Sequence, residues 1–178
     1  MTHTPYPESY YAASANPVPA RPELQGDVET DVCIIGAGYT GLSTAISLLE
    51  NGFKVAIVEA AKVGFGASGR NGGQIVNSYS RDIDVIERTV GPKPAQLMGQ
   101  MAFEGGRIIR ERIAKYKINC DLKDGGVFAA FTQKQMGHLE AQKKLWERYG
   151  HTQLELMDSK RIREVVGTEN YIGGMLDM

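Results

Sequence analysis

The sequence has little cysteine and no excess of either charge, and each shortage excludes a class of protein. Only two of the 178 residues are cysteines, Cys33 and Cys120, and neither belongs to a C-x-x-C or Cys/His pattern. Neither a disulfide scaffold nor a metal site is therefore indicated. The 20 Lys and Arg residues nearly balance the 21 Asp and Glu residues, which leaves no basic field for nucleic acid or an anionic membrane surface. We expect a reduced, cytoplasmic setting without a nucleic-acid or membrane partner.

Long apolar runs are also missing. The longest nearly apolar stretches, such as residues 32–35, are far shorter than the roughly 20 residues that a membrane-spanning helix needs. The N-terminus lacks the basic and apolar segments of a signal peptide. At roughly 100 to 200 residues per domain, the length allows one domain and part of a second.

Proline is concentrated near the N-terminus, where five of the seven prolines lie between Pro5 and Pro22. The segment has no hydrophobic periodicity, so residues 1–29 are predicted to form an extended arm. It also carries Tyr6, Tyr10 and Tyr11. Two interpretations are open: a disordered tail, or an arm that docks onto the folded body through its tyrosines.

From Asp31 onward the pattern predicts a βαβ unit. Residues 31–35 and 54–58 are short apolar runs, typical of fully buried parallel strands. Gly52 lies where a helix C-cap glycine belongs. The helix between the strands is indicated by apolar residues at three- and four-residue spacing, namely Leu42, Ala45, Ile46 and Leu49.

The turn after the first strand matches the dinucleotide fingerprint G-x-G-x-x-G. Gly36 permits the tight turn, Gly38 lets the backbone approach a pyrophosphate, and Gly41 lets the helix pack on the strand. The pyrophosphate would lie at the positive end of the helix dipole. Glu59 closes the second strand and is placed to accept hydrogen bonds from an adenosine ribose, which disfavours NADP. The alternative is a tight strand-to-helix turn without a ligand.

A second glycine cluster occupies residues 64–74. A NAD-binding unit does not need such a loop, whereas an extended cofactor does. Glycines let the backbone run alongside a large ligand, Ser68 offers a hydroxyl, and Arg70 and Gln74 offer donors for phosphate or isoalloxazine carbonyl groups. The alternative is a flexible surface loop with a solvated Arg70.

The rest of the chain shows the patterns of a second domain. A long amphipathic helix is predicted from Leu97 to Tyr116. Within it Gly105 and Gly106 cost about 1 kcal/mol each relative to alanine, so another group should approach closely there. Further elements follow in order: strand-like residues 127–131, a helix opened by a Thr132–Gln135 capping box and ended by Gly150, a short helix from the N-cap Asp158 to Gly167, and strand-like residues 171–178.

Three further groups are interpreted as structural. His138 and His151 are expected to be surface or helix-end residues rather than ligands. Three apolar residues are expected in the core: Met98, Met101 and Phe103. A basic helix face is expected to be solvated, with contact to an acidic partner domain as the alternative. This face comprises Arg107, Arg110, Arg112, Lys115 and Lys117.

The two glycine motifs, with Glu59-Ala60 between them, resemble the FAD-dependent amine and D-amino-acid oxidase superfamily. The resemblance is closer still to bacterial gamma-glutamylputrescine oxidases. The stretches that carry it are SYYAASAN at 9–16, NSYSRDIDVIE at 77–87, FEGGRIIRERI at 103–113 and WERYG at 146–150. We therefore predict an α/β fold, in which a doubly wound, Rossmann-like FAD-binding βαβ unit precedes the start of an α+β substrate domain. The predicted parts are the arm at 1–29, part of the FAD-binding domain at 30–118, and the start of the substrate domain at 119–178.

The resemblance implies a flavoenzyme of putrescine catabolism, with FAD as cofactor and a small-molecule amine and oxygen as partners. Such an enzyme oxidises the terminal amine of gamma-glutamylputrescine to an aldehyde and releases ammonia and hydrogen peroxide. No residue is identified as a catalytic base, and oligomeric state is not indicated. The match extends to predicted cofactor-binding residues: Gly36, Gly38, Tyr39, Thr40 and Gly41 at the pyrophosphate, Glu59 and Ala60 at the ribose, and Ser68, Gly69, Arg70, Asn71, Gly72, Gly73 and Gln74 towards the flavin.

The chain is shorter than this family requires, because two whole domains do not fit into 178 residues. We expect an N-terminal fragment that alone is inactive. Three alternatives are open: a non-catalytic nucleotide-binding module, a flavin oxidase acting on another amine or a D-amino acid, and a NAD-linked dehydrogenase, which the 64–74 loop disfavours.

Overall fold

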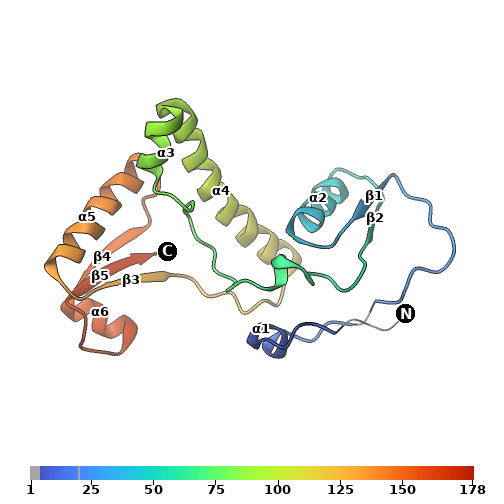
Figure 1. Cartoon of the computed structure of the whole chain (residues 1–178), viewed down its shortest axis with the longest axis horizontal. Coiled ribbons are helices and arrows are strands. Elements are labelled where there is room, and N and C mark those ends of the chain that lie inside the picture. Colours follow the sequence, from blue (N-terminus) through green and yellow to red (C-terminus); the bar gives the residue numbers. More distant parts are fainter. Residues whose placement is uncertain (1–4, 20) are drawn as a thin grey trace. The chain divides into compact units, whose positions relative to one another are not determined.

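The computed structural model describes residues 5–19 and 21–178, and the chain divides into two compact units. The first ends at Gln74 and contains a parallel βαβ unit; the second begins at Ile75 and combines helices with an antiparallel sheet (Figure 1). The fold is therefore mixed α/β, and the predicted parallel unit is present. The predicted division into functional domains after residues 29 and 118 stays a prediction.

The first unit is built from β1 (Val32–Ile35), α2 (Tyr39–Glu50) and β2 (Val55–Val58). The strands are parallel, with Val32 opposite Val55. Before β1, the Asp31 carboxylate accepts a hydrogen bond from the Lys54 N–H at 2.7 Å, which aligns the starts of both strands. After α2, Gly52 adopts a φ of +85° and turns the chain towards β2, as its predicted capping position requires.

The two strands are not fully buried, which corrects the expectation drawn from their apolar sequence. Ile35 is 88% exposed and Cys33 is also exposed, whereas Val32 and Ile34 are half-buried. Successive side chains point to opposite faces of a strand. Gly41 of α2 lies against Ile34, so the helix covers the face that carries Ile34. An apolar strand sequence makes both faces of a sheet suitable for burial, but both faces are buried only where other elements cover each of them.

The arm is docked and partly helical. Ser9 Oγ accepts a hydrogen bond from the Ala12 N–H at 3.2 Å and caps α1 (Tyr10–Ser14), so the expectation of a fully extended arm was wrong over these five residues. Short polar side chains favour helix starts in this way. The Tyr6 hydroxyl donates to the Val63 carbonyl at 2.7 Å, which agrees with the docking interpretation.

The second unit begins with two consecutive helices, α3 (Ile83–Val90) and α4 (Pro92–Tyr116). Gly91 separates them with a φ of +84°, and Pro92 begins α4 at a position where its missing N–H is harmless. Sequence analysis missed α3 and began the long helix five residues too late, at Leu97.

Of the paired glycines in α4, only Gly106 meets a close neighbour. A Cβ there would lie 3.0 Å from Asn77 Oδ1, whereas a Cβ at Gly105 would meet no described atom within 4 Å. The core prediction for this helix is also wrong at one position. Met98 and Phe103 pack against buried residues, but Met101 is 57% exposed because it lies on the outer face of α4.

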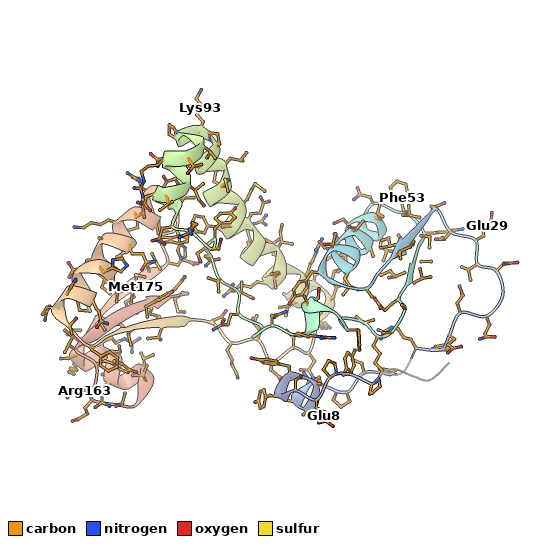
Figure 2. The ribbon with its side chains drawn as sticks, in the orientation of Figure 1. Glu8, Glu29, Phe53, Lys93, Arg163 and Met175 are labelled. Atoms are coloured by element: carbon orange, nitrogen blue, oxygen red, sulfur yellow. The ribbon has the colours of Figure 1, made fainter. Side chains whose placement is uncertain are left out.

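An antiparallel sheet forms the rest of the second unit. It consists of β3 (Gly126–Ala130), β4 (Leu154–Asp158) and β5 (Gly173–Asp177), with β5 in the centre. Phe128 and Leu156 flank Met175 across the sheet. Met175, labelled in Figure 2, is 2% exposed and packs in a core with Leu139 and Trp146. Sequence analysis did not predict β4.

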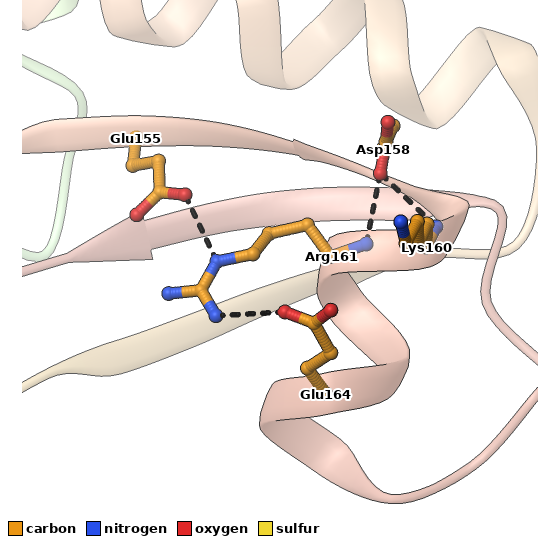
Figure 3. A network of polar contacts seen from close by, with 5 residues as sticks. All are labelled: Glu155, Asp158, Lys160, Arg161 and Glu164. Carbon is orange, nitrogen blue, oxygen red and sulfur yellow. Dashed lines mark hydrogen bonds and ion pairs between the residues drawn. The ribbon is translucent and has the colours of Figure 1, made fainter.

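Two helices accompany the sheet, and their caps are those predicted. α5 (Gln133–Arg148) starts with a capping box in which Thr132 Oγ1 accepts from the Gln135 N–H at 3.3 Å. α6 (Ser159–Val166) is capped by the Asp158 carboxylate, which accepts from the Lys160 and Arg161 N–H groups (Figure 3). The Arg161 side chain also pairs with Glu155 at 3.1 Å and Glu164 at 3.3 Å.

His138 is exposed as expected, whereas His151, just after the end of α5, is buried, which corrects the expectation that it lies on the surface. It is 6% exposed, and its Nε2 lies 2.7 Å from Asp177 Oδ1 on β5. Its ring stacks on Phe103 at 4.9 Å between centroids and meets the edge of Trp146. Gly150, with a φ of +100°, turns the chain after α5 and brings the histidine inward. The residues next to His151 in the sequence do not indicate that Phe103, Trp146 and Asp177 contact it.

Two residues of the basic face, Arg107 and Arg110, pair with acidic side chains. Arg107 pairs with Glu104 and Glu111 on the same helix, and Arg110 lies 3.1 Å from Asp124.

No helix among residues 5–19 and 21–178 is both long and apolar enough to cross a membrane.

Candidate functional site

The turn between β1 and α2 depends on two glycines, Gly36 for its left-handed backbone conformation and Gly41 for its close approach to other backbone. Gly36 has a φ of +100°, and its N–H donates to the Val58 carbonyl at 2.8 Å. A Cβ at Gly41 would lie 2.0 Å from the Gly36 carbonyl oxygen and 3.3 Å from Ile34 Cγ2. This is the close packing of helix on strand expected at Gly41, and it brings the start of α2 directly over the end of β1.

Glu59 follows β2 and faces the same turn. Its carboxylate accepts hydrogen bonds from the Ala37 N–H at 2.9 Å and the Ala61 N–H at 3.0 Å. These two donors, Ala37 first, hold the pKa of Glu59 below its usual value. A carboxylate offers about four acceptor positions, so Glu59 can still accept from a ribose hydroxyl.

The glycine loop after β2 closes on itself around the short 3₁₀ helix η1 (Ala67–Gly69). Gly64 has a φ of +70°, and its N–H donates to the Ala37 carbonyl at 2.9 Å. A Cβ at Gly69 would lie 2.2 Å from the Gly64 carbonyl oxygen. Two glycines of this loop are therefore required by its own fold, independently of any ligand.

Ser68 and Asn71 join this loop to the start of α2. Ser68 Oγ accepts a hydrogen bond from the Tyr39 N–H at 3.0 Å, and a Cβ at Gly38 would lie 3.0 Å from the same oxygen. Asn71 Nδ2 donates to the Tyr39 hydroxyl and the Ser68 carbonyl, each at 2.9 Å. Asn71 Oδ1 accepts from the Gly73 N–H. The structure thus brings Gly38, Tyr39, Ser68 and Asn71 together at one helix N-terminus.

Four other predicted site residues take no part in the hydrogen bonds of Ser68 and Asn71, although Thr40 is the second residue of α2. Arg70 turns back to its own loop, where its Nε donates to the Phe65 carbonyl at 3.0 Å. Gln74 lies near Gly72, as its Oε1 would be 3.6 Å from a Cβ there. Thr40 and Ala60 are exposed.

Sequence analysis missed Phe65 and Lys62, two residues that contact Tyr6 beside the loop. Tyr6 stacks on Phe65 at 6.5 Å between ring centroids, and Lys62 Nζ lies 4.9 Å from the Tyr6 centroid. The tyrosines of the arm were noted as docking groups, but nothing in the sequence indicated where they dock.

Two features of this site bear on whether a dinucleotide fits. The N-cap residue of α2 is a glycine without a side chain, and Ser68 accepts from the Tyr39 N–H, so the N–H groups of Thr40 and Gly41 are those that would meet an anion at the positive end of the helix. A Cβ at Gly36 or Gly73 would meet no described atom within 4 Å, which leaves room for a ligand beside the backbone. Among the described residues, no group of three or more His, Cys, Asp or Glu side chains could hold a metal ion.

The chain is similar to known proteins over nearly its whole length. The profile of a family described as FAD dependent oxidoreductase matches residues 31–178. Gamma-glutamylputrescine oxidoreductase of Escherichia coli is 55% identical over 98% of this chain and 41% of its own length. Probable oxidoreductase OrdL of Haemophilus influenzae is 41% identical over 95% of this chain and 39% of its own length. The chain thus spans about two fifths of these relatives.

Solved structures share the fold at low sequence identity. L-amino acid deaminase from Proteus vulgaris has a TM-score of 0.60 and 21% identity, covering 86% of this chain and 39% of its own. Glycine oxidase from Geobacillus kaustophilus has a TM-score of 0.57 and 20% identity, covering 83% of this chain and 38% of its own. At such identity the likeness concerns the fold.

Proposed function

The chain belongs to the FAD dependent oxidoreductase family, and from this premise we propose that its first unit supplies part of an FAD site. The observation that carries the proposal is the arrangement at the start of α2. There the Gly36–Gly41 turn, the Glu59 carboxylate and the Ser68–Asn71 segment are joined by hydrogen bonds within one unit. The family implies FAD, and the open helix end and the glycine backbone suit its pyrophosphate.

Each part of the site has a distinct task in this proposal. The N–H groups at the start of α2 bind the pyrophosphate, and Ser68 adds a hydroxyl beside them. The Glu59 carboxylate, whose pKa is lowered by the N–H groups of Ala37 and Ala61, accepts hydrogen bonds from the adenosine ribose. The exposed residues 69–74 follow the cofactor towards the flavin, with Arg70 providing a positive charge. FAD, when bound, supplies the acceptor for a hydride from the substrate.

We further propose that the substrate is gamma-glutamylputrescine. The support is the 55% identity to gamma-glutamylputrescine oxidoreductase over 98% of this chain. In the proposed reaction the primary amine, oxygen and water yield an aldehyde, ammonia and hydrogen peroxide. Because the chain spans 41% of that relative, the activity is proposed for the protein at its full natural length.

A peroxide assay tests the substrate proposal. The full-length protein is supplied with gamma-glutamylputrescine, putrescine or D-alanine, and hydrogen peroxide and aldehyde are measured. We expect release only, or by far fastest, with gamma-glutamylputrescine. Turnover of putrescine or D-alanine alone would instead identify a flavin oxidase for another amine or a D-amino acid.

A titration of the 178-residue chain with FAD tests the site itself, with NAD as the comparison ligand. We expect saturable FAD binding, seen as a shifted visible spectrum and quenched flavin fluorescence, and weaker binding of NAD. FAD binding without turnover by the full-length protein would favour a nucleotide-binding module. Stronger binding of NAD would contradict the assignment of FAD.

A further inference from the structure

Four side chains from the arm and the glycine loop form one continuous stack, here called the arm stack: Lys62, Tyr6, Phe65 and Arg70. Lys62 Nζ lies 4.9 Å from the centroid of the Tyr6 ring. Tyr6 stacks on Phe65 with an angle of 30° between the ring planes. Arg70 Cζ lies 5.1 Å from the centroid of Phe65 on the loop. A cation therefore lies over each of two stacked rings, a favourable arrangement for both.

Hydrogen bonds hold the arm stack in place. The Tyr6 hydroxyl donates to the Val63 carbonyl at 2.7 Å, which ties the arm to the segment that precedes the loop. Arg70 Nε donates to the Phe65 carbonyl at 3.0 Å, so the guanidinium is fixed to the residue on which it stacks. A second tyrosine of the arm also reaches the loop, since Tyr11 Oη would lie 3.5 Å from a Cβ at Gly72.

The loop needs such support from outside. Residues 69–74 are all exposed, and each residue fixed in one conformation costs roughly 1–2 kcal/mol of chain entropy, more for glycine. A terminal segment is itself poorly ordered unless it is tied down. Tyr6 bonds to Val63 and stacks on Phe65, so its contacts hold the arm in place and order the beginning of the loop at the same time.

We propose that Tyr6 is a positioning residue for the cofactor loop: through Phe65 it orients the Arg70 guanidinium, and the arm acts as a strap that keeps residues 64–74 ready for FAD. This inference rests on the function proposed above where it concerns FAD. Its claim about the order of the loop stands on the arm stack alone.

The test uses the 178-residue chain and two readouts. The first is hydrogen exchange of the Phe65, Gly69 and Arg70 amides without FAD, since these donate to loop carbonyls. The second is the dissociation constant for FAD. The variants are Tyr6→Ala, Tyr6→Phe and, as a control, Val18→Ala at an arm position that is 70% exposed.

In Tyr6→Ala we expect exchange of these amides to rise and FAD binding to weaken, each by about tenfold, the equivalent of one lost hydrogen bond and ring contact. Tyr6→Phe keeps the ring stack and loses only the hydrogen bond of the hydroxyl group, so this variant should retain most of the FAD affinity of the unaltered chain. Val18→Ala should match the unaltered chain in both readouts.

A double-mutant cycle separates positioning from general support. If Tyr6 acts through Arg70, then Tyr6→Ala should change FAD affinity little in an Arg70→Ala background. Additive effects would overturn the positioning role. Unchanged amide exchange in Tyr6→Ala would overturn the strap, even if the chain binds FAD tightly. Faster exchange in Tyr6→Ala, in a chain that takes up no FAD, would support the strap and contradict the proposed function alone.

Discussion

A methyl group at position 41 would lie 2.0 Å from the Gly36 carbonyl oxygen, a distance that only movement of the backbone can relieve. We therefore expect Gly41→Ala to cost about 1–3 kcal/mol of folding stability. FAD affinity should fall at least about tenfold, because the start of α2 is displaced from β1. Flavin titration and urea unfolding measure the two effects.

Gly66→Ala is the matched control for this change. A Cβ at Gly66 would meet no described atom within 4 Å, and Gly66 has a φ of −75°. It lies in the neighbouring loop of the same unit, so a comparable loss in this variant would show that the region does not tolerate any glycine replacement.

Glu59 is expected to titrate below 4.5, the value of an ordinary glutamate. Because its pKa is lowered in the folded state, its contribution to stability is present above pH 4.5 and is lost as the pH falls through the folded-state pKa. Carbon-13 NMR of the side-chain carboxyl group measures the midpoint, with the urea-unfolded chain as reference. A folded midpoint at or above the unfolded one would contradict the hydrogen bonds from Ala37 and Ala61.

Single residues were predictable where their reason is local. The close contact of Gly41 is with Gly36, five positions earlier, and each capping side chain accepts from N–H groups two or three residues later. His151 was not predictable in this way. Its burial depends on Phe103 and Asp177, which lie far away in sequence and reach it only through the packing of α4 and β5.

At the scale of elements, the capping box of α5 offers a direct test of local stabilisation. Thr132→Ala removes the acceptor for the Gln135 N–H, and loss of such a cap costs about 1 kcal/mol. Urea unfolding followed by circular dichroism measures the change. The same substitution at the exposed Thr152 should leave the free energy of unfolding unaltered.

Helices and strands were predicted where a hydrophobic periodicity is bounded by a glycine or a capping residue. The βαβ unit, α5 and α6 all end at glycines or begin at capping side chains, and they were found. The short helix α3 was missed because its eight residues span little more than two turns, although Gly91, the single residue between the two helices, marks its end. The strand β4 was missed because it is five residues long with two exposed positions beside each other, Glu155 and Leu156, which obscure the alternation.

At the scale of the whole chain, the two units differ in how much core they hold. Among the described residues, the buried apolar residues before Gln74 are Ala37 and Ala45, whereas the second unit buries Trp146, Met157 and Met175 among others. Burial of large apolar side chains is the main source of stability. We expect amides of β5 to exchange with solvent more slowly than those of β2.

Hydrogen exchange followed by mass spectrometry measures this difference in the 178-residue chain without ligand. Equal protection of both strands would contradict it. Addition of FAD should then slow exchange in the first unit, because a ligand that binds the folded state stabilises it by mass action.

The order of strands in the antiparallel sheet has a consequence for how the protein is made. β5 follows β3 and β4 in sequence, yet it lies in the centre of the described three-stranded sheet and pairs with both of them. During synthesis β3 and β4 leave the ribosome without a neighbour to pair with, and their edges stay open until residues 173–177 emerge. Formation of this sheet therefore waits for β5, and the β3–β5 pairs join residues far apart in sequence, which is typical of slow folding.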